Sequence, residues 1–170
     1  MKKVSICFAL AAATLLAATL ILAHPHFKKT VGVQLPGGVE ATIQYTTIPG
    51  NEARTRETAI GSFLTPPPRP ILKLSGEIKA GSVTVPAGDY TIGAIKNSGN
   101  DWTMGLYPGS LPRGQSADMS KVLKLESSYS ESAGRAGHLL IDISPGEGDF
   151  EGRAILTMHF GSMFLSGALS

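Results

Sequence analysis

The stretch SVTVPAGDYTIGAIKNSGNDWTMGLY, residues 82–107, contains the clearest fold signal in this chain. It opens with a short β-branched run that meets the segment 86–89, where Pro and Gly stand at positions that suit a type I turn. Two alternating runs follow, 90–95 and 102–107, and the turn-forming loop 96–101 separates them. The pattern predicts a β-hairpin that is preceded by a tight turn.

The alternation in this hairpin gathers large apolar side chains on one face. That face carries Tyr90, Ile92, Ala94, Trp102, Met104 and Leu106. Cross-strand pairs of aromatic and aliphatic residues are typical of a hairpin that faces a core. We therefore expect Trp102 to be a core residue. The alternative is a sugar-stacking surface formed by Tyr90, Trp102 and Tyr107.

The rest of the chain repeats short apolar runs between Gly and Pro turns. The runs span 30–35, 39–48, 121–126, 138–143, 153–160 and 163–169. They predict an all-β domain over 24–170, a single β-sandwich or flattened barrel of about eight or nine mostly antiparallel strands. The four prolines of 65–70 predict an extended connector within that domain. Segment 51–64 fits either one or two helical turns or a polar loop.

The first 23 residues have the pattern of an export signal. Lys2 and Lys3 precede an uncharged apolar run, 4–23, which ends in a small residue, Ala23. This arrangement predicts a secretory signal peptide over 1–23, and the alternative is an uncleaved membrane anchor. Both interpretations place the domain outside the cytoplasmic membrane, so we expect a periplasmic or secreted protein. Membrane contact is expected only through an uncleaved signal segment.

Charge and cysteine content narrow the chemistry. The formal charge of +2 is accounted for by Lys2 and Lys3, so the predicted domain is close to neutral. Nucleic acid is not an expected partner, because its recognition needs a basic surface. The single Cys7 lies in the export segment. Within 24–170 the sequence therefore offers no disulfide, no Cys-bound zinc and no Cys nucleophile.

The hairpin motif and a C-terminal run, AILTMHF at 154–160, resemble a family of exported bacterial proteins, the domain of unknown function 2911 family. The matching residues are Pro86, Ala87, Gly88, Tyr90, Trp102, Thr103, Leu156 and Thr157. The resemblance covers at best residues 71–169. The family's upstream Trp-Arg-x-Gly-Ala-Asn segment is absent, with at most a remnant at 51–53. The resemblance implies a secreted β-rich domain and brings no established activity.

A histidine pair beside the expected cleavage site raises one metal hypothesis. Cleavage after Ala23 would leave His24 at the new N-terminus, where its α-amine and imidazole can bind Cu(II) in a histidine brace. Pro25 has no N–H, which excludes a chelate through ionised backbone amides. The second imidazole would come from His26, His138 or His159, of which His138 is expected to be exposed. The plainer interpretation is that these histidines only follow the cleavage site.

Signatures of hydrolases and nucleotide-binding proteins are missing from the sequence. There is no Gly-x-Ser-x-Gly, His-Glu-x-x-His or Gly-x-x-x-x-Gly-Lys motif. Segment 147–152 has the acidic alternation of a calcium loop, but Met158 stands where the bidentate Glu belongs, so a hairpin loop is expected. We predict an exported protein that binds an envelope or extracellular ligand or has a structural role. The alternatives are a copper-binding protein using His24 and, third, an envelope or polysaccharide hydrolase; no catalytic residue is assigned.

Overall fold

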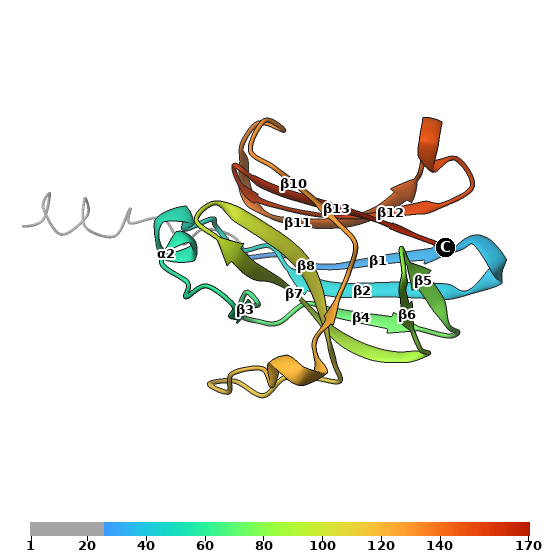
Figure 1. Cartoon of the computed structure of the whole chain (residues 1–170), viewed down its shortest axis with the longest axis horizontal. Coiled ribbons are helices and arrows are strands. Elements are labelled where there is room, and N and C mark those ends of the chain that lie inside the picture. Colours follow the sequence, from blue (N-terminus) through green and yellow to red (C-terminus); the bar gives the residue numbers. More distant parts are fainter. Residues whose placement is uncertain (1–25) are drawn as a thin grey trace, which may run out of the picture.

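The structure, a computed structural model, describes residues 26–170, which form two antiparallel sheets packed face to face (Figure 1). This confirms the expected all-β fold. The predicted signal segment 1–23 and His24 lie outside the described residues. No helix within 26–170 combines the length and the apolarity needed to cross a membrane.

The larger sheet contains the predicted hairpin as two of its inner strands. Its strand order is β1 (Lys28–Gln34), β2 (Glu40–Thr46), β4 (Ile71–Leu74), β7 (Gly88–Ser98), β8 (Asp101–Pro108) and β9 (Leu123–Lys124). A seventh strand, β3 (Phe63–Leu64), continues the pairing of β7 beyond the end of β4. The predicted hairpin forms as β7–β8, with Ile92 opposite Leu106, and the runs 30–35 and 39–48 form a second hairpin, β1–β2, with Val31 opposite Ile43.

The smaller sheet is built from the C-terminal third of the chain. Its order is β10 (Ser128–Ser130), β13 (Met163–Leu169), β12 (Ala154–Gly161) and β11 (Ala136–Pro145). A separate ribbon joins β5 (Ile78–Ala80) to β6 (Val83–Val85), so β6 pairs backward with β5 and not forward with β7. Very short strands such as β3, β9 and β10 bring the number of strands within 26–170 above the predicted eight or nine.

Backbone hydrogen bonds join the smaller sheet to the rest of the fold on both sides. On one side, Lys79 of β5, in the separate β5–β6 ribbon, and Ser170, which follows β13, exchange a pair of bonds with N–O distances of 2.6 and 2.9 Å. On the other side, the chain beyond β2 reaches β11, where the Leu139 N–H donates to the Ile48 carbonyl at 2.8 Å. The molecule is therefore a sandwich whose edges are partly closed, as in a flattened barrel.

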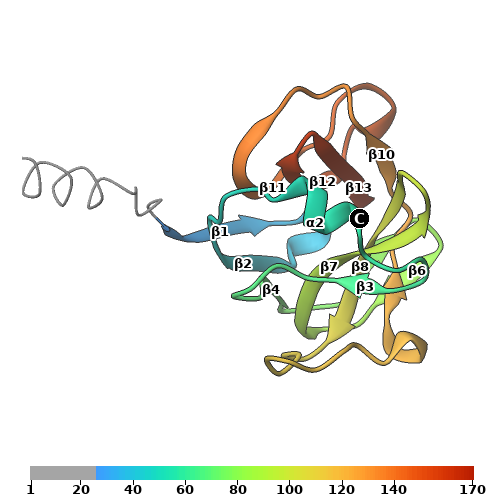
Figure 2. The same cartoon turned by 90° about the vertical axis from the view of Figure 1, so that its left-hand side faces the viewer.

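The helical segments are short. They comprise α2 (Glu52–Arg56) and the 3₁₀ turns η1 (Pro36–Gly38), η2 (Met119–Lys121) and η3 (Gly148–Phe150). The Asn51 side chain caps α2 by accepting the Arg54 N–H at 3.1 Å, as short amides do at helix starts. Segment 51–64 thus combines one helical turn with strand β3. Figure 2 shows α2 between the two sheets at one end of the sandwich.

The core lies between the sheets and is centred on the β7–β8 hairpin. Trp102 is only 1% exposed, which confirms it as a core residue and makes the sugar-stacking interpretation wrong. Tyr90 is also buried, and its hydroxyl donates to the Pro86 carbonyl at 2.8 Å, across the preceding turn. One apolar cluster joins Ile43, from before the Pro-rich connector, with these hairpin residues.

Glycines on β7 and β8 let β3 pack closely. Gly93 and Gly105 are paired across the hairpin. A Cβ atom at Gly93 would lie 2.4 Å from the Leu64 carbonyl oxygen and 2.5 Å from Cζ of Phe63. Only a residue without a side chain therefore allows β3 to reach this position. The requirement matters for function because Leu64 lines the cavity described below.

Candidate ligand-binding cavity

A cavity of about 630 Å³ opens between the two sheets at the end where α2 lies. Its walls are mainly apolar and come from both sheets and from the segments that lead into and out of α2. They comprise Ile48, Pro49, Leu64, Pro66, Pro67, Ala94, Trp102, Leu139, Met158, Phe160, Met163 and Leu165. Polar residues lie mostly on or beside α2: Asn51, Arg54, Thr55, Glu57, Thr58 and Thr65. The cavity therefore combines an apolar interior with a polar rim.

The local sequence explains why the sandwich is open at this end. Pro49 follows β2, and Pro66 and Pro67 follow β3; because these prolines lack a backbone N–H, they cannot donate to a strand ladder, and β2 and β3 end before them. Ala94 places only a methyl group on the inner face of β7, where Ile92 of the same strand is much larger. The space left by short strands and a small side chain is bordered by α2.

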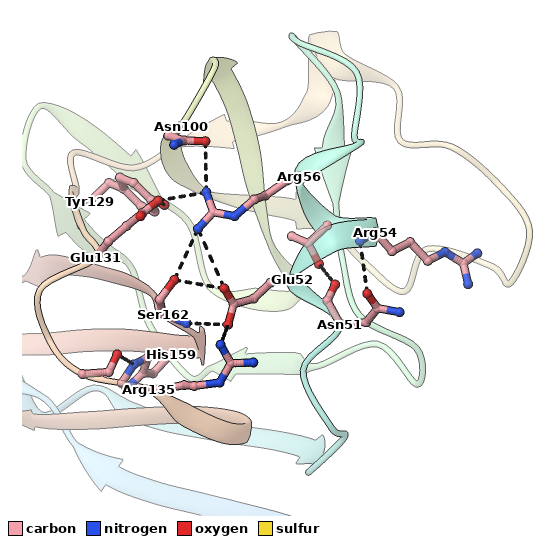
Figure 3. A network of polar contacts seen from close by, with 12 residues as sticks. Asn51, Glu52, Arg54, Arg56, Asn100, Tyr129, Glu131, Arg135, His159 and Ser162 are labelled. Atoms are coloured by element: carbon pink, nitrogen blue, oxygen red, sulfur yellow. Dashed lines mark hydrogen bonds and ion pairs between the residues drawn. The ribbon is translucent and has the colours of Figure 1, made fainter.

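A polar network holds the start of α2 against the smaller sheet (Figure 3). The Glu52 carboxylate accepts hydrogen bonds from the Ser162 backbone N–H at 3.0 Å and the Ser162 hydroxyl at 3.1 Å. It also pairs with Arg135 at 2.8 Å. Gly161 has φ +64°, and a Cβ there would lie 2.2 Å from Glu52 Oε1. The glycine of the β12–β13 turn thus makes room for the carboxylate.

The end of α2 is held in place by Arg56. Its guanidinium donates to Glu131 and to Asn100, both at 2.9 Å. The Tyr129 hydroxyl donates to the same Glu131 oxygen at 2.6 Å. The bond to Glu131 raises the pKa of Arg56, and the bonds from Arg56 and Tyr129 hold the pKa of Glu131 below its usual range. Burial, followed by the bond to Glu131, raises the pKa of Tyr129 to about 12.

The Tyr129 phenol gives this network a signature in alkaline solution. A tyrosine in an unfolded chain ionises at about pH 10. The folded chain therefore holds the phenolic proton of Tyr129 more tightly than the unfolded chain does. The resulting stabilisation is complete below about pH 10 and is lost as the pH rises toward 12. We expect a late step in an ultraviolet titration of tyrosinate, to which Tyr129 and Tyr90 contribute, since burial raises the pKa of Tyr90 as well. Tyr129→Phe should remove one tyrosine's share of that step and Tyr107→Phe, outside the network, should leave it unchanged; an undiminished late step in Tyr129→Phe would contradict the assignment.

On the inner side of α2, Lys96 and Trp102 lie together. Lys96 is 8% exposed, and its ammonium donates to the Arg56 carbonyl at the end of the helix. Its Nζ lies 5.8 Å from the centre of the Trp102 ring, within the range of a cation–π contact. The Trp102 Nε1–H is buried and has no acceptor among residues 26–170. This nitrogen is almost completely covered by protein atoms, so the donor is enclosed in the core and is not presented to the cavity.

The histidines predicted as metal ligands are not assembled into a centre within the described residues. His26 is exposed, with Nδ1 3.2 Å from the Thr47 carbonyl. His159 lies on the face of β12 opposite Met158 and packs edge-on against Phe164 at 5.4 Å. Residues 26–170 hold no cluster of three or more His, Cys, Asp or Glu suited to a metal ion. The brace at His24 remains a hypothesis about a residue outside the described part.

The expectation that His138 is exposed is wrong. The glycine-containing loop before His138 predicts an exposed ring, yet the ring's Nε2 is buried and has no partner among the described residues. The reason is that the chain beyond β2 pairs with β11 at this point, with Pro49 bridged to His138. Segment 147–152 forms the exposed β11–β12 connection around η3. This is the hairpin loop expected for a segment that lacks the bidentate Glu of a calcium loop.

Compared with protein-family models, curated proteins and solved structures, the chain gives no match. The resemblance carried by the hairpin motif thus stays a prediction. The function must be argued from the cavity itself. Sequence reasoning missed this cavity, because its walls come from segments far apart in the chain.

Proposed function

We propose that this protein binds a small, largely apolar molecule in the inter-sheet cavity and does so outside the cytoplasm. The observation that carries the proposal is a space of about 630 Å³ with apolar walls and a polar rim. Small-molecule sites typically have this size and this lining, with a few polar groups that fix orientation. The signal-like pattern of 1–23 supports the location.

Binding is favoured over catalysis by how the charged groups near the cavity are used. Glu52, Arg56 and Glu131 are already paired in the network that holds α2. Arg56 forms an ion pair with each carboxylate, and Glu52 also accepts a hydrogen bond from the Ser162 N–H. Their hydrogen bonds run between α2 and the smaller sheet (Figure 3). These residues thus position the boundary of a binding site. At typical efficiencies per atom, an apolar ligand of fused-ring size would bind with a Kd of roughly 10 μM.

The test uses the neutral fluorescent probe N-phenyl-1-naphthylamine, whose emission rises in apolar surroundings. Thr58 lines the cavity and Ala59, the next residue, is exposed and does not line it. We expect Thr58→Phe to fill the entrance and weaken probe binding by about tenfold or more, a loss of about 1.4 kcal/mol. Ala59→Phe, which adds the same ring outside the cavity, should bind as the native chain does.

Two results would contradict the proposed function. One is the absence of saturable probe binding to the native chain. The other is equal affinity in the native chain, Thr58→Phe and Ala59→Phe, which would place the probe elsewhere on the surface. Circular dichroism of each variant separates a blocked cavity from a chain that does not fold.

A further inference from the structure

The rim of the cavity narrows the chemistry of the ligand, and this inference rests on the proposed function. Apart from Thr65, the polar lining residues belong to α2 or to the residues at its two ends. Arg54 and Thr55 follow the capping residue Asn51 by three and four positions, a spacing that places residues on one side of a helix. α2 therefore borders the cavity through residues other than those that bind the network.

Arg54 carries the positive charge of the rim and is not used by the fold. Figure 3 shows the side chains of Arg54 and Arg56 leaving α2 in opposite directions, with Arg54 directed away from the network. Arg54 is exposed, and none of the ion pairs within residues 26–170 includes it. A guanidinium presents a fork of N–H donors that matches the two oxygens of a carboxylate. Arg54 can therefore bind an anion at the rim.

The uncharged polar groups of the rim add donors. The Asn51 side-chain oxygen accepts the Arg54 N–H at 3.1 Å, which leaves the amide N–H₂ group as a donor. The Thr58 hydroxyl can donate as well as accept. The other two hydroxyls are engaged: Thr55 donates to the Asn51 carbonyl at 3.0 Å, and Thr65 donates to a backbone carbonyl of β7 at 2.8 Å. The uncharged rim thus favours a ligand group that accepts hydrogen bonds.

Glu57 places a negative charge on the same rim. It is exposed, and no ion pair within residues 26–170 joins it to Arg54, so the guanidinium remains available to a ligand. A cationic ligand group would have Glu57 as its attractive partner, whereas an anionic one would have Arg54 together with the donors of Asn51 and Thr58. The larger set of partners favours the anion.

The interior beyond the rim suits a hydrocarbon chain. Several apolar lining residues remain half-buried and so offer surface that a ligand can cover: Ile48, Pro49, Leu64, Pro66 and Phe160. The lining residues that belong to described strands include no ionisable side chain. A molecule bound here meets apolar walls inside the cavity and hydrogen-bond donors at its rim.

We propose that the ligand is an anionic amphiphile, a hydrocarbon chain that ends in a carboxylate, such as a medium-chain fatty acid. The chain occupies the cavity, and the carboxylate binds the Arg54 guanidinium at the rim. Because Arg54 is exposed, the carboxylate stays in contact with water and avoids the cost of burying a charge. For the same reason, the ion pair contributes modestly to affinity, and the covered apolar surface contributes most of it.

The experiment uses decanoate and 1-decanol, two probes with the same hydrocarbon chain that end in a carboxylate and a hydroxyl. Each displaces N-phenyl-1-naphthylamine from the cavity at neutral pH, where decanoate is ionised, and at concentrations where both probes are monomeric. In Arg54→Gln, we expect the affinity ratio of decanoate to 1-decanol to fall about three- to tenfold relative to the native chain. Taking the ratio within each protein cancels the contribution of the shared chain.

Two further variants serve as controls. Arg113→Gln removes the same charge from an exposed residue that does not line the cavity, so the ratio should stay at its native value. Glu57→Gln removes the repulsive charge of the rim, so the ratio should stay equal or rise. Added salt should weaken the binding of decanoate more in the native chain than in Arg54→Gln, because it screens the exposed ion pair.

The outcomes separate this inference from the function on which it rests. An unchanged ratio in Arg54→Gln, or an equal fall in Arg113→Gln or Glu57→Gln, would overturn the carboxylate inference and leave the cavity as a binding site. Absence of binding by both probes and by N-phenyl-1-naphthylamine would overturn both proposals. Circular dichroism establishes that Arg54→Gln is folded, as expected for a side chain that the ion pairs of the fold do not include.

Discussion

Replacing Trp102 by alanine is expected to lower the free energy of unfolding by about 3–5 kcal/mol. The indole is 1% exposed and packs between the sheets, so its removal deletes a large buried apolar surface. The new void would adjoin the existing cavity, which Trp102 lines. Urea unfolding followed by circular dichroism measures the change without relying on tryptophan emission.

The matched control is Phe150→Ala on the exposed β11–β12 connection. Phe150 is 47% exposed, and its truncation should cost less than about 1 kcal/mol. A loss below about 1 kcal/mol for Trp102→Ala as well would show that the indole contributes no core packing. Such a result would contradict the central place of the β7–β8 hairpin in this fold.

The second large effect is expected from a single added methyl group. Gly93→Ala would place Cβ 2.4 Å from the Leu64 carbonyl oxygen, a backbone atom that can move only if strand β3 moves. We expect a loss of about 2–3 kcal/mol in the free energy of unfolding, as for other overpacked interiors. Because Leu64 lines the cavity, affinity for N-phenyl-1-naphthylamine should fall at the same time.

Gly32→Ala provides the comparison on strand β1. No atom lies within 4 Å of a Cβ built there. The same substitution should then be neutral or slightly stabilising, since alanine restricts the unfolded chain more than glycine does. Urea unfolding of both variants, with hydrogen exchange of the β3 amides, measures the difference. Equal stabilities for the two variants would contradict the close packing of β3 on β7.

Much of the fold could be predicted because apolar and polar residues alternate locally along the strands. The runs around Trp102 and the hairpin that pairs Val31 with Ile43 carry a period of two that reads directly as half-buried strands. Lys96 shows the limit of that reasoning. The sequence places it at the start of a polar loop, whereas β7 continues to Ser98 and turns Lys96 toward the Arg56 carbonyl.

The candidate site could not be predicted for a related reason. Glu52 and Arg56 stand four residues apart, which indicates a possible helix, and they do approach each other at 3.8 Å. Their stronger partners, Arg135 and Glu131, lie far along the chain on segments next to the smaller sheet. Contacts over such separations depend on tertiary packing, which local periodicity does not encode. The same holds for the cavity that these contacts help to border.

The network around α2 suggests separate determinants for the affinity and the rate of the proposed binding. Under the proposed function, the apolar walls contact the bound molecule and determine its affinity. Glu52 and Arg56 do not line the cavity; they hold α2, which borders it, against segments beside the smaller sheet. We therefore expect substitutions at Glu52 or Arg56 to change the residence time of a bound molecule more than its affinity.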